Sequence, residues 1–333
     1  MTTTVVAEAG VNHNGDLTLA MRLVEAAVEA GADFVKFQTF SAVRLATVTA
    51  SKAAYQHAAT GSVESQLNML RRLELDPAAH RALVARCAEL RIGFLSTAFD
   101  VESVDFVIDL GVPLLKIPSG DITNLPYLRH VGSQGKPVLM STGMATMSEV
   151  GNAMTVLENA GLPRSEITLL HCTTEYPTPM EDVNLRAMTA LRDAFGVAVG
   201  YSDHTRGIEV PVAAVALGAT VIEKHFTLDR DQVGPDHRAS LEPDELRAMI
   251  TAIRNIEVAL GDGNKSPKAG ELENARVARK SLVAARDIRA GEPFSAENLA
   301  VKRPGTGVSP MRWDDAMGRI ARRNYAADEL IEL

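Results

Sequence analysis

Eight short apolar segments, separated by stretches of helical periodicity, recur along the first four-fifths of this 333-residue chain. Residues 17–30 and 147–160, for example, repeat apolar side chains at the spacing of one helix face. Eight strand-then-helix units in series predict an α/β protein built as a (β/α)8 barrel. The expected strands are TVVAEAG, DFVKFQT, GFLSTAF, LLKIPSG, PVLMSTG, ITLLHCTT, VAVGYSDH and VIEKHF.

Nearly all of these segments end in reactive side chains. In a (β/α)8 barrel the C-terminal ends of the strands build the active site. The sequence therefore predicts an enzyme whose site lies at that mouth of the barrel. The side chains in question are Glu8, Lys36, Gln38, Ser96, Thr97, Lys116, Ser119, Ser141, Thr142, His171, Thr173, Thr174, Ser202, Asp203, His204, Glu223 and His225.

Composition and charge limit the partners and the compartment. The chain has 34 Lys and Arg against 42 Asp and Glu, a net charge of −8, and no basic run, so we expect no nucleic-acid partner. Cys87 and Cys172 fit reduced buried thiols rather than a disulfide framework. No apolar run could span a bilayer, and MTTTVVAEAG lacks the basic region of a signal peptide, so we expect a cytoplasmic protein without membrane contact.

The texture of the chain changes towards its C-terminal end. We expect a catalytic barrel over residues 1–262, a Gly-, Lys- and Pro-containing linker over 263–277, and a second domain of short strands and turns over 278–333. A domain of this size is only marginally stable alone, so it should lean on another surface. Residues 41–76 are long enough to form an active-site loop followed by helical turns.

Two histidines end neighbouring strands of the expected barrel. His204 ends the seventh strand and His225 lies at the end of the eighth, so their imidazoles can converge over one mouth. Two histidines completed by carboxylates and waters suit Mn²⁺, Fe²⁺, Co²⁺ or Zn²⁺. Asp203 and Glu223 flank the pair and could orient rings or waters. Spacing alone fits equally well two histidines that only hydrogen-bond to their neighbours.

A second set combines strand-borne lysines with small hydroxyls. Lys36 and Lys116 lie inside apolar strands, where burying a lysine is costly. With Ser119, Ser141 and Ser202 they offer charge, hydroxyls and free N–H groups to a phosphate or a carboxylate. Each serine alone would also fit a helix cap, and a Schiff base on one lysine is a rival role.

The remaining polar candidates at the mouth are Glu8, Gln38, Asp121, Glu175, Tyr176 and Asp236. Glu8 ends the first strand, where a carboxylate can act as an acid or a base, or fix the loop. Asp236, in the GPDHRAS segment after the eighth strand, can lie over the mouth. We expect His13 to be structural and His237 to be solvated.

A dozen motifs occur in a recognisable order. They are AEAGVNHNG, VKFQTF, STAFD, KIPSGD, STGMAT, HCTTEYPTP, GYSDHT, EKHFTLD and GPDH in the barrel, and RKSLVA, DIRAGE and VKRPGTG in the tail. In these motifs the chain closely resembles the bacterial sialic acid synthase family, whose barrel is followed by a small antifreeze-like (SAF) domain. The resemblance covers nearly all of the chain. It implies a metal-dependent condensation of phosphoenolpyruvate with an N-acyl-mannosamine-type sugar, giving a nine-carbon α-keto acid and phosphate.

The resemblance also implies residue roles. His204 and His225 would hold Mn²⁺, or Co²⁺ or Mg²⁺ in its place. Arg303 would reach from the SAF domain of one subunit into the barrel of the other, in a domain-swapped homodimer. The phosphoenolpyruvate ligands would be Lys36, Thr97, Lys116, Ser119, Ser141 and Ser202. The sugar and the proton transfers would involve Glu8, Gln38, Asp121, Tyr176 and Asp236, with Glu8 as the proton relay.

Two positions bear on the identity of the sugar. Some family members carry Asn in place of Thr174 and Glu in place of Asp121, and both positions face the sugar. The resemblance implies N-acetylmannosamine or its 2,4-diacetamido-6-deoxy analogue, because HCTTEYP and YSDHTRG resemble legionaminic acid synthases at least as much as N-acetylneuraminate synthases. The alternatives are a Schiff-base aldolase, an enzyme acting on a sugar phosphate, whose extra basic cluster we do not find, and a non-catalytic carbohydrate- or ice-binding protein.

Overall fold

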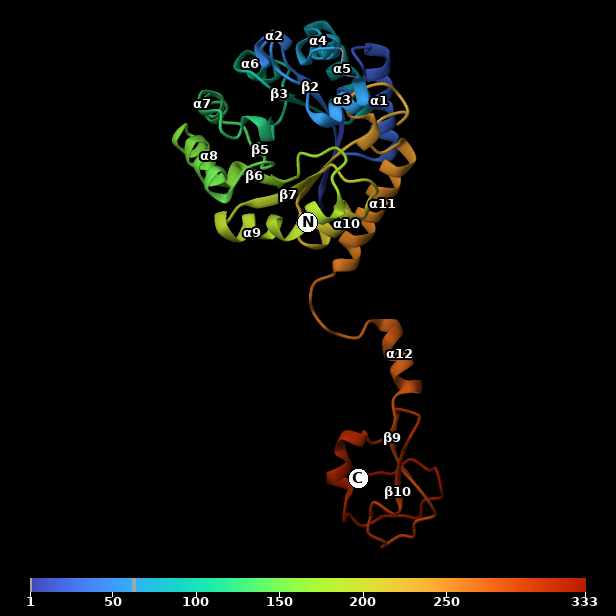
Figure 1. The fold of residues 1–333 in the computed structure, drawn as a ribbon. Coiled ribbons are helices and arrows are strands. Elements are labelled where there is room, and N and C mark those ends of the chain that lie inside the picture. Colours follow the sequence, from blue (N-terminus) through green and yellow to red (C-terminus); the bar gives the residue numbers. More distant parts are fainter. Residues whose placement is uncertain (1, 62–63) are drawn as a thin grey trace. The chain divides into compact units, whose positions relative to one another are not determined.

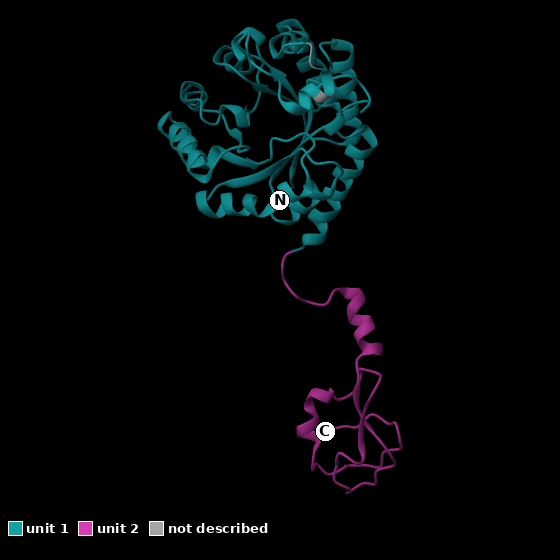
Figure 2. Ribbon diagram, viewed as in Figure 1, with its two compact units in different colours: residues 1–261 teal, residues 262–333 magenta. Residues whose placement is uncertain are grey.

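The computed structural model describes residues 2–61 and 64–333. It divides into two compact units, residues 1–261 and 262–333 (Figure 2). Within the described ranges, no helix is both long and apolar enough to cross a membrane.

The first unit is a closed barrel of eight parallel strands in sequence order (Figure 1). The strands are β1 (Thr4–Gly10), β2 (Phe34–Thr39), β3 (Gly93–Ala98), β4 (Leu115–Ile117), β5 (Val138–Ser141), β6 (Ile167–His171), β7 (Ala198–Asp203) and β8 (Val221–His225). Strand β1 pairs with both β2 and β8, which closes the sheet. The prediction of a (β/α)8 barrel is confirmed.

Helices form the outer layer of the barrel (Figure 1). The long ones are α1 (Leu17–Ala30), α5 (Pro77–Leu90), α6 (Val101–Asp109), α7 (Leu125–Ser133), α8 (Met147–Asn159), α9 (Leu185–Phe195), α10 (Glu209–Ala216) and α11 (Pro243–Leu260). Asp16, Asp76 and Asp100 begin three of them by accepting hydrogen bonds from first-turn N–H groups, as N-caps do. Short helical pieces interrupt the loops: α2 (Ala42–Leu45), α3 (Ala54–Thr60), α4 (Gln66–Leu73), and the 3-10 turns η1 (Ser119–Asp121), η2 (Arg164–Glu166), η3 (Met180–Asp182) and η4 (His237–Ala239).

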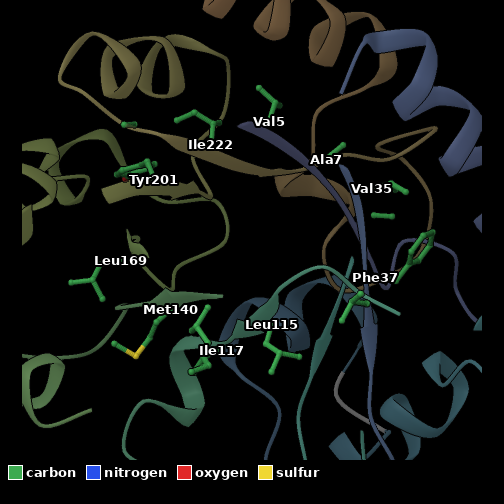
Figure 3. Close-up of a cluster of buried hydrophobic side chains, with 14 of the residues drawn as sticks. Val5, Ala7, Val35, Phe37, Leu115, Ile117, Met140, Leu169, Tyr201 and Ile222 are labelled. Carbon is green, nitrogen blue, oxygen red and sulfur yellow. The ribbon is translucent and has the colours of Figure 1, made fainter. Parts of the chain in front are cut away.

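Side chains alternate between the two faces of each strand. The outward set, which includes Val5, Val35 and Ile222, packs against the helices in the main apolar core (Figure 3). A smaller cluster, in which Val6 and Val221 take part, lies on the inner face. Two residues further along each strand the same inner face turns polar. These positions include Glu8, Thr97, Ser141 and Glu223, so the period of the strands aims the reactive residues into the mouth.

The second unit has its own apolar cluster, to which Leu282, Phe294 and Tyr325 belong. It contains the antiparallel pair β9 (Ser281–Ala284) and β10 (Leu299–Lys302), the helices α12 (Ala269–Ala278) and α13 (Trp313–Ala316), and the turn η5 (Pro310–Arg312). Most of α12 lies in the segment that we expected to be a linker. Its residues are almost all exposed, and an apolar stripe that would have revealed it in the sequence is missing.

Candidate active site

A cavity of about 560 Å³ lies at the C-terminal ends of the barrel strands. It is lined by every barrel residue that the family resemblance assigned to the metal, the substrates or the proton transfers. These are Glu8, Lys36, Gln38, Thr97, Lys116, Ser119, Asp121, Ser141, Thr174, Tyr176, Ser202, His204, His225 and Asp236. Glu223, which we expected only to flank the histidines, lines the cavity as well.

One half of the cavity, which we call the lysine half, is built on β2 to β5. The Lys36 ammonium donates to Thr97 Oγ1 at 2.8 Å and contacts the Glu8 carboxylate. The Lys116 ammonium donates to Ser141 Oγ at 2.7 Å. Glu223, from β8, lies between them, with one oxygen 3.5 Å from each lysine nitrogen. The two ammonium groups therefore share the Glu223 carboxylate, and Lys36 also contacts that of Glu8.

The charge states in this half follow from burial and proximity. Burial lowers the pKa of Lys116, whereas for Lys36 the neighbouring Glu223 and Glu8 outweigh burial and raise the pKa. Burial alone would raise the pKa of Glu223, but Lys116 and Lys36 outweigh it and lower that pKa to about 2. Burial raises the pKa of Glu8 to about 7 even though Lys36 opposes it. Near neutral pH the carboxylates of this half therefore do not fully balance its lysines, so it can accept an anion.

Two glycines let backbone approach the site closely. Gly10, at φ +52°, ends β1 where an added Cβ would lie 3.1 Å from Glu8 Oε1 and 3.2 Å from His225 Cε1. Gly143 follows β5, and its Cβ would lie 2.8 Å from the Ser119 hydroxyl oxygen, which instead accepts the Gly143 N–H at 3.0 Å. The glycine of the STG turn is thus required by contact with Ser119.

The other half, which we call the histidine half, is built on β6 to β8. The rings of His204 and His225 lie 5.6 Å apart, centre to centre. His204 Nδ1 donates to the Thr173 carbonyl at 2.6 Å, so its Nε2 carries the lone pair. His225 Nδ1 is buried and has no hydrogen-bond partner within the described ranges. Burial lowers the pKa of His204, and lowers that of His225 further, so both rings are neutral near pH 7.

These features fit a divalent metal ion. Neutral imidazole is the form that binds metals, and a ligating histidine commonly donates its other N–H to a backbone carbonyl, as His204 does. No cluster of three or more His, Cys, Asp or Glu that could hold a metal occurs in the part of the chain that the structure describes. An ion held by His204 and His225 would therefore need water or substrate oxygens to complete its shell.

Aromatic rings cover the histidines. The ring of Tyr176 lies 4.1 Å from that of His204, and Tyr55 stacks on Tyr176 at 4.9 Å with an interplanar angle of 25°. Tyr55 and Gln56 belong to α3 and also line the cavity. We predicted neither residue from the sequence. The unusual length of residues 41–76 signalled a loop at the site, but not which of its side chains reach the cavity.

Two carboxyl groups on the cavity wall differ in their partners. The Asp236 carboxyl makes no side-chain hydrogen bond to the described residues, and burial raises its pKa to about 7. Asp121, in η1, accepts from Asn124 Nδ2 at 2.9 Å, and burial raises its pKa as well. Asp236 is therefore the carboxyl group with a free hydrogen-bonding edge towards the cavity.

Three barrel residues considered above do not line the cavity, namely Glu175, His237 and His13. Glu175 is exposed and does not line it. The expectation that His237 is solvated was wrong: the residue is fully buried, and its Nδ1 lies 2.7 Å from Thr227 Oγ1, because the segment after β8 folds back onto the barrel. His13 is fully buried and its Nδ1 accepts the Gly15 N–H at 3.0 Å. Arg303 is exposed in the second unit, where its Nε donates to the Ala278 carbonyl at 3.1 Å.

Known proteins match both units. A model of the NeuB family matches residues 23–265, and a model of the SAF domain matches residues 279–332. N,N'-diacetyllegionaminic acid synthase of Campylobacter jejuni is 55% identical over 329 residues, which cover 99% of this chain and 98% of the relative. The enzyme of that name from Legionella pneumophila is 48% identical over 98% of this chain and 92% of the relative. A solved N-acetylneuraminic acid (sialic acid) synthetase from Leptospira borgpetersenii superposes with a TM-score of 0.72 at 35% identity, covering 82% of this chain and 90% of that one.

Proposed function

Because this chain belongs to the NeuB family, we propose that it is a nonulosonate synthase that makes N,N'-diacetyllegionaminate. The reaction would join phosphoenolpyruvate to a 2,4-diacetamido-6-deoxy mannose and release phosphate. We choose the 2,4-diacetamido-6-deoxy sugar because the chain is 55% and 48% identical to two N,N'-diacetyllegionaminic acid synthases. N-acetylmannosamine, the other sugar that the motifs implied, is the second candidate, supported by the likeness to the Leptospira sialic acid synthetase.

The lysine half of the cavity would bind phosphoenolpyruvate. Lys36 and Lys116 would neutralise its phosphate and carboxylate, and the hydroxyls of Thr97, Ser141 and Ser202 would donate further hydrogen bonds. Binding an anion there would also relieve the repulsion between two buried ammonium groups. Held in this way, C3 of the enol would face the histidine half, which gives the reaction its orientation.

We propose Mn²⁺ as the cofactor, with Co²⁺ or Mg²⁺ as substitutes, held by His204 and His225. When bound, the ion would act as a Lewis acid on the aldehyde oxygen of the open-chain sugar. The imidazoles would supply neutral nitrogen ligands, and Tyr176 would shield them from solvent on one side.

Glu8 and Asp236 would move the protons. C3 of phosphoenolpyruvate bonds to the aldehyde carbon, and Asp236, neutral below pH about 7, donates a proton to the aldehyde oxygen. Water then adds at C2 and gives a proton to Glu8, which lies beside Lys36. The C2–O bond to phosphate breaks, the remaining C2 hydroxyl proton passes to the departing phosphate, and the keto group forms.

Mass spectrometry of the product tests the substrate. The enzyme with Mn²⁺ and phosphoenolpyruvate should convert the 2,4-diacetamido-6-deoxy sugar to a nine-carbon keto acid at least about tenfold more efficiently than N-acetylmannosamine. The opposite ranking would overturn the sugar assignment and leave the synthase assignment intact. Borohydride should trap no substrate on the protein, and a trapped adduct on Lys36 or Lys116 would indicate the Schiff-base alternative.

We further propose a homodimer in which Arg303 of one subunit completes the barrel site of the other. The planar guanidinium suits a carboxylate or an acyl carbonyl. His225→Ala and Arg303→Ala should each be inactive alone, yet their mixture should regain activity, because a mixed dimer contains one site with both parts intact. Lack of recovery after verified subunit exchange would assign Arg303 to its own barrel or to no site.

A further inference from the structure

An ion pair joins strands β7 and β8 behind the two histidines. Asp203 and Lys224 face each other in the strand register, and each immediately precedes one histidine, His204 or His225. Because side chains alternate along a strand, the histidines turn towards the cavity and the ion pair turns away from it. Both charged side chains are fully buried, and neither lines the cavity.

Thr205 ties this pair to the backbone on the far side of His204. The Asp203 carboxylate accepts the Thr205 N–H and the Thr205 hydroxyl, each at 3.0 Å. The Lys224 ammonium contacts the Asp203 carboxylate and donates to the Thr205 carbonyl at 2.7 Å. The two residues that flank His204, Asp203 and Thr205, therefore both bind Lys224, which immediately precedes His225.

Stability alone does not account for this arrangement. Taking two charges fully out of water costs several kcal/mol per ion, and apolar replacements of such pairs are often neutral or stabilising. The outer face of β7 and β8 is otherwise apolar, with Tyr201 and Ile222 in the main core. A charged pair that is saturated by carbonyl, N–H and hydroxyl partners instead fixes one geometry, because any slip of one strand would leave a buried charge unpaired.

We propose that Asp203 and Lys224 are positioning residues, which set the separation of the His204 and His225 imidazoles before a metal ion binds. The inference rests on the metal site proposed above. Ligand nitrogens have to be held within about 0.5 Å of the binding geometry by neighbours that packing and hydrogen bonds lock in place, and a saturated ion pair is such a neighbour. The pair acts through the two histidines and touches neither substrate.

Mn²⁺ binding to the metal-free protein tests this role without recourse to activity. The double variant Asp203→Asn/Lys224→Met keeps the side-chain volumes and removes both charges. Its dissociation constant for Mn²⁺, read from the free-ion EPR signal, should rise by about tenfold to a hundredfold, the range for residues that support metal ligands. Phosphoenolpyruvate affinity of the same metal-free protein should change by less than about twofold, because the lysine half keeps its contacts.

A matched control removes an ion pair at the other end of the barrel. Arg254 donates to Asp33 at 2.9 Å near the start of β1 and β2, so Asp33→Asn/Arg254→Met should leave Mn²⁺ affinity unchanged. Thr205→Val removes one hydrogen bond without burying a charge, and should weaken Mn²⁺ binding about two- to fivefold even if the double variant does not fold.

The outcomes separate the positioning role from the metal site itself. Weaker Mn²⁺ binding in Thr205→Val, and also in the double variant if that variant folds, supports the proposal when the control is unchanged. Wild-type Mn²⁺ affinity in Thr205→Val overturns it, as does wild-type affinity in a folded double variant. If the wild-type protein binds no Mn²⁺, the metal site fails, and this inference fails with it.

Discussion

The lysine half and the histidine half of the cavity are both built from strand ends, but burial affects their basic residues differently. In the lysine half, the Glu223 carboxylate offsets the burial of two lysines, which lower its own pKa to about 2. In the histidine half, burial lowers the pKa of His204 and His225 and outweighs the nearby Glu223 carboxylate, which would raise both. The lysine half is thus suited to an anion, and the histidine half has imidazole lone pairs that are suited to a metal ion.

This difference would let one mouth hold the two substrates proposed above side by side. The Glu223 side chain, on β8, joins the two halves: Lys36 and Lys116 of the lysine half lie 3.5 Å from it, and the Ser202 hydroxyl on β7 donates to it at 2.9 Å. A negative ligand in the lysine half competes with Glu223 for the lysines, whereas a neutral sugar in the histidine half does not. The two sites are therefore adjacent but chemically distinct.

Removing either histidine should have the largest effect, and it should disable the histidine half alone. His204→Ala or His225→Ala is expected to abolish Mn²⁺ binding and lower kcat by at least about a thousandfold, since a Lewis acid supplies several kcal/mol. Phosphoenolpyruvate should still bind, because the lysine half is intact. Calorimetric titration with phosphoenolpyruvate checks the second point, and loss of phosphoenolpyruvate binding in a folded variant would mean that the halves are not separable.

Asp236 should give the next largest effect and a distinctive pH dependence. Its pKa is raised from 3.8 to about 7, so the proton that it would donate is lost as the pH rises through 7, and kcat/KM for the sugar should fall. Asp236→Asn should lower kcat by about a hundredfold or more and remove that alkaline limb. Profiles between pH 6 and 9 for both proteins decide the point, since an unchanged limb in the variant would assign it to another group.

The same shift has a consequence for stability. A carboxyl group whose pKa is higher in the folded state binds its proton more tightly there, so its stabilising contribution is present below pH 3.8 and is lost as the pH approaches 7. The free energy of unfolding of the wild type, relative to Asp236→Asn, should decline over that interval in urea titrations. A constant difference would show that the Asp236 carboxyl is solvated in the folded protein.

Substituting Lys116 should impair the lysine half by a smaller factor. Lys116→Met removes a charge-assisted contact worth roughly 1.5–3 kcal/mol, so kcat/KM for phosphoenolpyruvate should fall by at least about tenfold. Mn²⁺ affinity should stay near the wild-type value. Lys136→Met is the matched control, because Lys136 donates to the Val112 carbonyl before β5 begins and does not line the cavity, so both quantities should stay unchanged. Wild-type kinetics in Lys116→Met would make this lysine structural.

The sequence predicted the barrel and the mouth residues because both depend on strand period and strand order. Glu8 and Glu223 share the inner face with Val6 and Val221, two residues earlier, and that spacing is visible in the chain itself. The pairing of Asp203 with Lys224 was not predicted, because it depends on the register between two strands. His237 was misjudged because its burial depends on how a loop folds back, which no period encodes.

Tyr55 lines the cavity and stacks on Tyr176, and its substitution should have the smallest effect. It belongs to α3, in a segment without a regular period, so tertiary contact alone brings it to Tyr176. Its hydroxyl oxygen accepts a long bond from Gln56 Nε2, at 3.4 Å, and no acceptor for its proton occurs among the described residues. A sugar hydroxyl or acetamido oxygen in the cavity would be such an acceptor.

Tyr55→Phe keeps the ring stacked on Tyr176 and removes only this donor. A neutral hydrogen bond contributes about 0.5–1.5 kcal/mol, so KM for the sugar should rise roughly two- to tenfold while KM for phosphoenolpyruvate stays constant. Tyr201→Phe, on the outer face of β7, should change neither value (Figure 3). Steady-state kinetics with each substrate varied in turn measures both. If Tyr55→Phe raised the two KM values equally, Tyr55 would hold the loop in place rather than contact the sugar, and the boundary between the two halves would lie nearer to Tyr176.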